Sequence, residues 1–214
     1  MIVDENIVTF INSMELPEST LLETIEREAL EAYVPIIRKE TKSLLKVLLA
    51  LTRPARILEV GTAVGYSALV MNAYAPEGCR ITTIENYDRR IPVARENFRR
   101  AGKEEAIELI AGDALDVMRK LEGPYDFIFM DAAKGQYIRY LPEVTRLLSP
   151  GGLLVSDNVL QDGDVTKSRF AVERRNRTIH SRMREYLLEL KHNTDFETTI
   201  LPAGDGVALS VKRL

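Results

Sequence analysis

The chain has 214 residues, of which 45% are hydrophobic and 29% charged, and its formal net charge is −3. These values fit one large globular domain and exclude collagen-like, disordered and disulfide-stapled proteins. Cys79 is the only cysteine, so neither an intrachain disulfide nor a cysteine cage for a metal can form. The acidic N-terminus and the lack of a long apolar stretch predict a cytoplasmic protein with no signal peptide and no membrane partner.

Residues 19–51 predict two helices. Ser19 or Thr20 can cap the first helix, Glu23 follows at capping-box spacing, and apolar residues recur at helical intervals. Pro35 separates this helix from a second apolar stripe.

After these helices, short apolar runs alternate with helical patterns. We expect strands at 55–61, 79–85, 107–113, 125–131 and 153–158. We expect helices between them at 67–75, 88–102, 114–123 and 137–152. Strands that are almost continuously apolar and separated by helices predict a parallel sheet with helices on both faces.

The end of the chain breaks this alternation. Residues 196–214 hold two β-rich runs around the turn at 202–206, which predicts an antiparallel hairpin. The predicted fold is therefore α/β: a Rossmann-like, doubly wound, mostly parallel seven-stranded sheet with a C-terminal antiparallel hairpin. We expect a single domain of residues 1–214, in which an N-terminal helical cap (1–53) covers the Rossmann-like core (54–214).

Each predicted parallel strand ends in a carboxylate. In chain order these residues are Glu59, Glu85, Asp113, Asp131 and Asp157. Ligands of such sheets bind outside the carboxyl ends of the strands, so we expect a binding site there.

The turn after the first strand contains Gly61 and Gly65. Glycines let the backbone approach a ligand, but this G-x-x-x-G spacing is not the G-x-G-x-x-G of dinucleotide-binding proteins, and a packing turn explains the pair equally well. Glu85 lies 20 residues after Gly65, at the end of the next strand, where a carboxylate can accept hydrogen bonds from both ribose hydroxyls. The alternative for Glu85 is an ordinary exposed loop acid.

Asp131, Asp157 and Asn158 offer three oxygen ligands at two predicted strand ends. A set without sulfur or imidazole suits a hard divalent cation such as Mg²⁺. The alternative is that Asp157 and Asn158 only form a turn. Lys134 lies three residues after Asp131 and, taken alone, is a solvated charge.

Five motifs in chain order resemble those of one enzyme family. They are EVGTAVG at 59–65, Glu85, GDA at 112–114, FMDAAKGQY at 129–137 and SDNVL at 156–160. Together they resemble class I S-adenosylmethionine-dependent O-methyltransferases of the metal-dependent catechol and caffeoyl-CoA group. The resemblance implies a methyl-donor site formed by Ile37, Glu59, Gly61, Ser67, Glu85, Gly112, Asp113, Ala114 and Asp131. In it, Glu85 binds the ribose and Asp113 and Ala114 lie beside the adenine.

The same resemblance implies the rest of the active site. Asp131, Asp157 and Asn158 bind Mg²⁺ or another hard divalent cation, and Lys134 and Asp131 are catalytic. A cation near Lys134 favours its neutral amine, so Lys134 either deprotonates the substrate hydroxyl or orients an oxygen that is already ionised. The family also implies a homodimer.

The region around Lys134 departs from the catechol enzymes, which have a tryptophan there. This chain has no tryptophan, and alanines, Gly135 and Gln136 surround the lysine. The chain instead resembles bacterial tRNA 5-hydroxyuridine methyltransferases in four places. They are these residues around Lys134, DNVL with Gly163 nearby, ERRNR at 173–177 and PAGDG at 202–206. The resemblance implies that the substrate is the wobble base of the tRNA anticodon loop, which becomes 5-methoxyuridine.

A basic segment fits that substrate. Residues 167–184 hold seven basic residues and one acid, a net charge of +6, which leaves −9 on the rest of the chain. One basic segment on a mildly acidic protein argues against indiscriminate coating of nucleic acid and leaves room for local contacts with tRNA phosphates, and we expect no DNA partner. Arg174, Arg175 and Arg177 are the densest group of such residues. The alternative is a solvated basic helix.

Three other functions remain to be weighed. A small-molecule O-methyltransferase acting on catechols or caffeoyl-CoA-like substrates would use the same site. A noncatalytic donor-binding or RNA-binding protein would not need the set of Asp131, Lys134, Asp157 and Asn158. A nicotinamide dehydrogenase is disfavoured because the G-x-G-x-x-G motif is absent.

Overall fold

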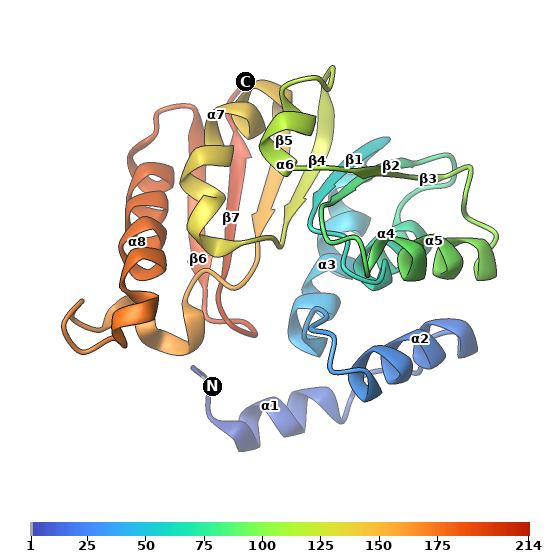
Figure 1. Ribbon diagram of the computed structural model, residues 1–214, viewed down its shortest axis with the longest axis horizontal. Coiled ribbons are helices and arrows are strands. Elements are labelled where there is room, and N and C mark those ends of the chain that lie inside the picture. The colour runs from blue at the N-terminus through green and yellow to red at the C-terminus, as the bar shows by residue number, and fades with distance from the viewer. Residues whose placement is uncertain (1) are drawn as a thin grey trace.

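A seven-stranded sheet runs through the computed structural model, which describes residues 2–214 (Figure 1). The strand order is β3-β2-β1-β4-β5-β7-β6; β1 to β5 are parallel, and β7 is antiparallel to both β5 and β6. The strands are β1 Arg56–Val60, β2 Arg80–Glu85, β3 Ile107–Ala111, β4 Tyr125–Met130, β5 Leu148–Ser156, β6 Phe196–Leu201 and β7 Val207–Lys212. The predicted fold class and C-terminal hairpin are confirmed.

Helices cover both faces of the sheet. They are α1 Glu5–Asn12, α2 Thr20–Glu31, α3 Lys39–Thr52, α4 Tyr66–Tyr74, α5 Ile91–Arg100, α6 Ala114–Met118, α7 Tyr137–Leu147 and α8 Arg177–His192. Short 3-10 helices are η1 Lys134–Gln136, η2 Gln161–Thr166 and η3 Arg174–Asn176. Within residues 2–214, no helix has both the length and the apolar character needed to cross a membrane.

Successive residues of a strand pack into two separate hydrophobic cores, one on each face of the sheet, which explains the continuous apolar runs. Phe127 and Phe129 of β4 pack with α2 to α5, whereas Ile128 and Met130 pack with α6 to α8. All four side chains are fully buried. Because side chains alternate between the faces of a strand, a sheet covered on both faces requires apolar residues at every position.

The three largest differences between the predicted and observed helices concern α1, α6 and α7. Helix α1 was not expected; Asp4 caps it, but none of its residues is buried, so it carries no core pattern to detect. Helix α6 ends at Met118 rather than at 123. Helix α7 ends at Leu147 rather than at 152, because the following residues enter β5, where Leu148 pairs with Tyr125 of β4. The division into a cap of residues 1–53 and a core stays a prediction.

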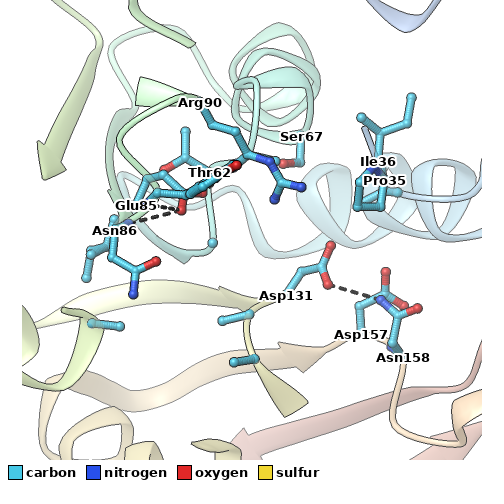
Figure 2. A pocket seen from close by; sticks show the side chains of 18 of the residues that line it. Pro35, Ile36, Thr62, Ser67, Glu85, Asn86, Arg90, Asp131, Asp157 and Asn158 are labelled. Carbon is cyan, nitrogen blue, oxygen red and sulfur yellow. Dashed lines mark hydrogen bonds between the residues drawn. The ribbon is translucent and has the colours of Figure 1, made fainter. Parts of the chain in front are cut away.

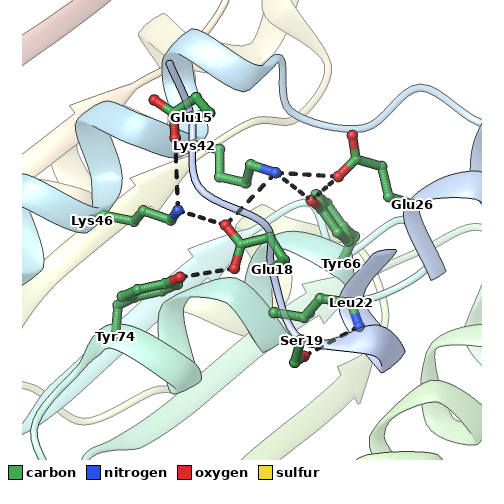
Figure 3. A network of polar contacts seen from close by, with 9 residues as sticks. All are labelled: Glu15, Glu18, Ser19, Leu22, Glu26, Lys42, Lys46, Tyr66 and Tyr74. Carbon is green, nitrogen blue, oxygen red and sulfur yellow. Dashed lines mark hydrogen bonds and ion pairs between the residues drawn. The ribbon is translucent and has the colours of Figure 1, made fainter. Parts of the chain in front are cut away.

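A polar network fastens α2 and α3 to α4 (Figure 3). The Lys42 ammonium of α3 lies 3.2 Å from a Glu26 carboxylate oxygen of α2 and 3.1 Å from the Tyr66 hydroxyl of α4. Glu18 accepts a hydrogen bond from Tyr74 of α4 and pairs with Lys46 of α3 at 2.5 Å. Buried charges are tolerated when each has a partner. The network therefore fixes the chain between α2 and α3, which lies over the carboxyl ends of the strands.

The ends of β1 and β4 meet at Gly61. Its φ is +105°, and a Cβ atom there would overlap the carbonyl group of Asp131. The Asp131 amide also donates to the Val60 carbonyl at 3.0 Å. Only glycine permits this approach, so Gly61 sets the distance between two strand ends.

We therefore expect Gly61→Ala to lower the free energy of unfolding by about 3 kcal/mol or more, since steric overlap adds to the cost of a positive φ. Gly78→Ala is the matched control: its φ is +84°, but a Cβ there meets no atom within 4 Å, so about 1 kcal/mol is expected. Urea unfolding of both variants measures the difference. Equal losses would contradict the assigned contact.

Candidate active site

A cavity of about 450 Å³ opens at the carboxyl ends of the parallel strands (Figure 2). Its walls come from the glycine turn after β1, the residues after β2 and β4, the start of α4 and the segment before α3. Among the predicted site residues, the lining includes Ile37, Gly61, Ser67, Glu85, Gly112, Ala114, Asp131, Lys134, Asp157 and Asn158. Glu59, Asp113 and the three arginines do not line it.

Glu85 is held rigidly at the end of β2. One carboxylate oxygen accepts the Ala63 amide at 2.8 Å, and the other accepts the amides of Asn86 and Tyr87 at 3.0 and 2.9 Å. Its side chain is almost buried, yet it lines the cavity. A carboxylate fixed by three backbone donors offers its remaining lone pairs to a ligand in one orientation.

Glu59 lies behind the cavity wall. It is fully buried in β1 and accepts hydrogen bonds from the hydroxyls of Ser67, at 2.5 Å, and Thr83. Burial raises the pKa of Glu59 to about 7; the two hydroxyls oppose that rise, and the charges of Asp131 and Glu85 add to it. The structure thus places Glu59 as a support for Ser67, which does face the cavity.

Asp113 caps α6 instead of facing the cavity. Its carboxylate accepts the amides of Leu115 and Asp116 at 2.9 and 3.2 Å, and the residue is exposed. This is the ordinary use of an aspartate at a helix N-terminus. Its neighbours Gly112 and Ala114 do line the cavity. A role of Asp113 in donor binding stays a prediction.

Two acidic side chains meet at the far end of the cavity, where β4 and β5 end (Figure 2). Asp131 accepts a hydrogen bond from the Asn158 amide group at 3.0 Å, and the Lys134 ammonium lies 3.5 Å from the same oxygen. Asp157 is buried and accepts hydrogen bonds from the Asn158 backbone at 2.8 Å and from the Thr41 hydroxyl at 3.3 Å. Desolvation, followed by the charge of Asp131, raises the pKa of Asp157.

The donor set fits a hard divalent cation. Two carboxylates and an amide oxygen from adjacent strand ends match the ligands that such ions prefer. Burial and the neighbouring charge of Asp131 both disfavour the ionised form of Asp157, and a bound cation would oppose both effects. Asn158 has a φ of +59°, a left-handed conformation that asparagine adopts more readily than most residues, and its side chain donates to Asp131.

Tyr137 holds together the ends of β4 and β5, which carry Asp131 and Asp157. Its hydroxyl lies 3.1 Å from the carbonyl oxygens of both Met130 and Asp157 and accepts the Ala132 amide at 3.3 Å. The side chain is fully buried. Tyr137 therefore packs in the core and joins β4 to β5.

Two residues of this region carried no sequence signal. Thr41 reaches Asp157 from α3, 116 positions away in the chain, and only tertiary packing reveals it. Arg90 points into the cavity beside Ser67 and stacks 5.3 Å from the Tyr87 ring (Figure 2). It lies one residue before α5.

Comparison with known proteins identifies the family. A model of the O-methyltransferase family matches residues 12–213. The chain belongs to the O-methyltransferase family. A catechol O-methyltransferase of Niastella koreensis is 34% identical over 176 residues, which cover 78% of this chain and 77% of the relative.

Solved structures agree with this assignment. A Staphylococcus aureus protein solved as a candidate caffeoyl-CoA O-methyltransferase has a TM-score of 0.89 and 31% identity, and the match covers 98% of this chain and 100% of that one. An O-methyltransferase of Streptomyces achromogenes involved in tomaymycin synthesis, solved with S-adenosylmethionine, has a TM-score of 0.85 and 25% identity, with 98% and 96% covered.

The three arginines of this O-methyltransferase have different surroundings outside the cavity. Arg177 donates to the backbone carbonyls of Val172 and Phe170, so it holds its own segment together. Arg175 pairs with Glu173 at 2.7 Å. The side chain of Arg174 is exposed and makes no ion pair or hydrogen bond within residues 2–214. Of the three arginines, Arg174 is therefore the one whose guanidinium has no competing partner within residues 2–214.

The buried Glu59 makes the stability of this O-methyltransferase depend on pH. Its pKa is about 7 in the folded chain, against a reference value of 4.5, so between these values the folded state binds a proton that the unfolded state lacks. Stability conferred by protonated Glu59 is present below pH 4.5 and is lost as the pH rises towards 7.

Glu59→Gln removes this titration while keeping a side chain of similar shape. We expect the variant to gain about 2 kcal/mol relative to the wild type between pH 5 and pH 8. Chemical denaturation at several pH values measures this gain. A constant difference between the two proteins across that range would contradict the buried, proton-binding Glu59.

Proposed function

We propose that this O-methyltransferase transfers the methyl group of S-adenosylmethionine to the 5-hydroxyl oxygen of 5-hydroxyuridine at the wobble position of tRNA, with Mg²⁺ or another hard divalent cation. One observation carries the chemical part of the proposal: Asp131, Asp157 and Asn158 gather beside Lys134 at one end of a cavity of about 450 Å³.

The rest of the cavity would hold the donor. Glu85 would accept the ribose hydroxyls, since its carboxylate is already oriented, and Gly112 and Ala114 would lie beside the adenine. Gly61, Ser67 and Asp131 would contact the methionine part, and Ile37 would cover it from the segment before α3. When bound, the donor supplies a methyl group on a sulfonium sulfur for in-line displacement by an oxygen nucleophile.

Asp131, Asp157 and Asn158 would hold the cation. When bound, it orients two vicinal substrate oxygens and lowers the pKa of the hydroxyl among them. Thr41 and the Asn158 backbone keep the Asp157 carboxylate in place, and Tyr137 keeps the two strand ends together. These contacts preorganise the substrate oxygens relative to the donor.

Lys134 is the residue proposed to act on the hydroxyl group of the substrate. Its ammonium is 3.5 Å from Asp131 and its side chain is 30% exposed, so it can reach both the acidic pair and an incoming substrate. Lys134 receives the proton of the substrate hydroxyl, or it orients the oxygen after that proton has left. Asp131 fixes the position of the amine in either case.

Charge and substrate chemistry support RNA as the substrate. The 4-carbonyl and 5-hydroxyl oxygens of 5-hydroxyuridine are vicinal, like those of a catechol. Residues 167–184 carry a net charge of +6, and α8 contacts η1 through the bond from Arg182 to the Gly135 carbonyl. Arg174, Arg175 and Arg177 would contact phosphates of the anticodon loop. The bases of this loop are unpaired, so turning one of them into the cavity costs little free energy. DNA contains no 5-hydroxyuridine in an anticodon loop, so we propose no DNA substrate.

We also propose that the protein acts as a homodimer.

A small-molecule substrate is the second candidate. The named relatives include a catechol O-methyltransferase and a candidate caffeoyl-CoA O-methyltransferase, and the same acidic pair can serve any substrate with two vicinal oxygens. In this case the basic segment is a solvated surface.

Transfer of labelled methyl groups decides between the two substrates. The wild-type protein is given labelled S-adenosylmethionine and tRNA from cells that lack it, with Mg²⁺ or with a chelator, and the nucleosides are analysed by mass spectrometry. We expect 5-methoxyuridine to appear at the expense of 5-hydroxyuridine only with Mg²⁺. Transfer to a catechol but not to tRNA would move the function to small molecules.

The metal assignment has its own test. We expect Asp157→Asn to weaken Mn²⁺ binding, followed by electron paramagnetic resonance, at least about tenfold and to abolish turnover, because one charged ligand is lost. Asp116→Asn is the control, since Asp116 is an exposed aspartate on α6 with a single ion pair of 3.7 Å. Unchanged Mn²⁺ affinity in Asp157→Asn would remove Asp157 from the ligand set.

A further inference from the structure

Among the described residues, three cationic side chains line the active-site cavity, and two of them have acidic partners. The Lys134 ammonium lies 3.5 Å from an Asp131 carboxylate oxygen, and the Arg38 guanidinium lies 3.2 Å from an Asp162 carboxylate oxygen. The third cation, Arg90, makes no ion pair and no side-chain hydrogen bond within residues 2–214. Its guanidinium group therefore keeps all its hydrogen-bond donors for a ligand in the cavity.

The direction of the Arg90 side chain is fixed by other contacts. The residue precedes α5, where its amide donates to the Tyr87 carbonyl at 2.8 Å and its carbonyl accepts the Ala94 amide at 2.9 Å. The half-buried side chain extends into the cavity on the side of Ser67, and its guanidinium carbon lies 5.3 Å from the centre of the Tyr87 ring (Figure 2). These contacts orient the arginine without using its N–H groups.

The glycine turn after β1 does not supply donors for an anion. The amides of Gly61 and Thr62 donate to the Ile84 carbonyl at 3.0 and 3.2 Å, and the Ala63 amide donates to Glu85 at 2.8 Å. In glycine-rich loops that bind anions, such amides point at the ligand instead. These three amides are not available to an anion, so a side-chain donor gains importance.

The other polar groups of the cavity favour cations. The Ser67 hydroxyl donates its proton to Glu59 at 2.5 Å, so its oxygen presents lone pairs to the cavity. Three acidic side chains of the described chain also line the cavity: Glu85, Asp131 and Asp157. The ammonium group and the sulfonium sulfur of S-adenosylmethionine would be attracted by these acids, whereas its carboxylate would be repelled. The carboxylate therefore needs a cationic partner.

We propose that Arg90 binds the α-carboxylate of S-adenosylmethionine. This group is the one anionic part of the donor, and a guanidinium group can bind it through two parallel hydrogen bonds. The assignment rests on the donor site of the proposed function, in which Ser67 contacts the methionine part and Glu85 the ribose. Arg90 thereby selects the complete donor over adenosine derivatives that lack the carboxylate.

Calorimetric titration of two ligands tests the contact. They are S-adenosylhomocysteine, which keeps the carboxylate, and its decarboxylated analogue; neither can transfer a methyl group. Arg90→Met removes the charge but keeps an unbranched side chain. We expect it to weaken S-adenosylhomocysteine at least about tenfold, because a charged hydrogen-bond partner is lost. The affinity of the decarboxylated analogue should stay the same or rise, since this ligand has no anion to lose a partner.

Arg89→Met is the matched control. Arg89 is the preceding residue, is exposed and does not line the cavity, so both ligands should bind this variant as they bind the wild type. Arg90→Lys keeps the charge without the two parallel donors, and its affinity for S-adenosylhomocysteine should lie between those of the wild type and Arg90→Met.

The ratio of the two affinities separates a carboxylate contact from a loss of structure, which would weaken both ligands. An equal loss for both ligands in Arg90→Met, an unchanged ratio, or the same change of ratio in Arg89→Met overturns the assignment. If circular dichroism shows that Arg90→Met does not fold, Arg90→Lys replaces it. The ratio should then fall at least about threefold, and an unchanged ratio overturns the assignment.

Failure of the Arg90 contact is distinguishable from failure of the proposed function. An unchanged ratio together with methyl transfer to tRNA leaves the function intact and removes Arg90 from the carboxylate. A reduced ratio without transfer to tRNA keeps the Arg90 contact and removes the tRNA substrate. Absence of S-adenosylhomocysteine binding to the wild type overturns both.

Discussion

The active site depends on the placement of two carboxylates side by side at the ends of β4 and β5. Asp131 and Asp157 repel each other, and burial makes the charge of Asp157 still more costly, as its raised pKa shows. The fold compensates only in part, with Lys134 and Asn158 at Asp131 and Thr41 at Asp157. Such an arrangement is unfavourable for stability alone, and the cation proposed above would offset its repulsion.

The groups beneath the cavity keep this arrangement rigid. Glu59 accepts hydrogen bonds from the hydroxyls of Ser67 and Thr83 behind one end of the cavity, and Tyr137 joins the backbones of β4 and β5 behind the acidic pair. Both side chains are fully buried and polar, so each needs its partners in place. The two ends of the cavity are thereby fixed by separate hydrogen-bond systems, joined where Gly61 touches Asp131.

Sequence predicted the fold well because its signals are local. Apolar runs marked the strands, and the acids that follow them marked the edge where the cavity opens. The predicted end of α7 was wrong because β5 begins earlier than its apolar core, at Leu148. Sequence patterns could not show that Thr41 reaches Asp157, or that Glu59 lies behind the wall, because these facts depend on packing between distant segments. Arg177 illustrates the same limit: its charge pattern indicated a phosphate contact, whereas its main hydrogen bonds go to its own segment.

Helix α8 links the basic segment to the acidic pair. Its Tyr186 hydroxyl lies 2.6 Å from the Ser156 hydroxyl at the end of β5, and its ring packs edge-on against Tyr137 at 5.4 Å. Near its start, Arg182 holds the Lys134 loop. Any vicinal pair of oxygens can meet the acidic pair, so that pair alone discriminates poorly among substrates. Groups on the first turns of α8 are rigidly connected to the reacting end of the cavity. The RNA proposed above would be positioned at two points if it contacts them, and its selection would then rest on this segment as well as on the acidic pair.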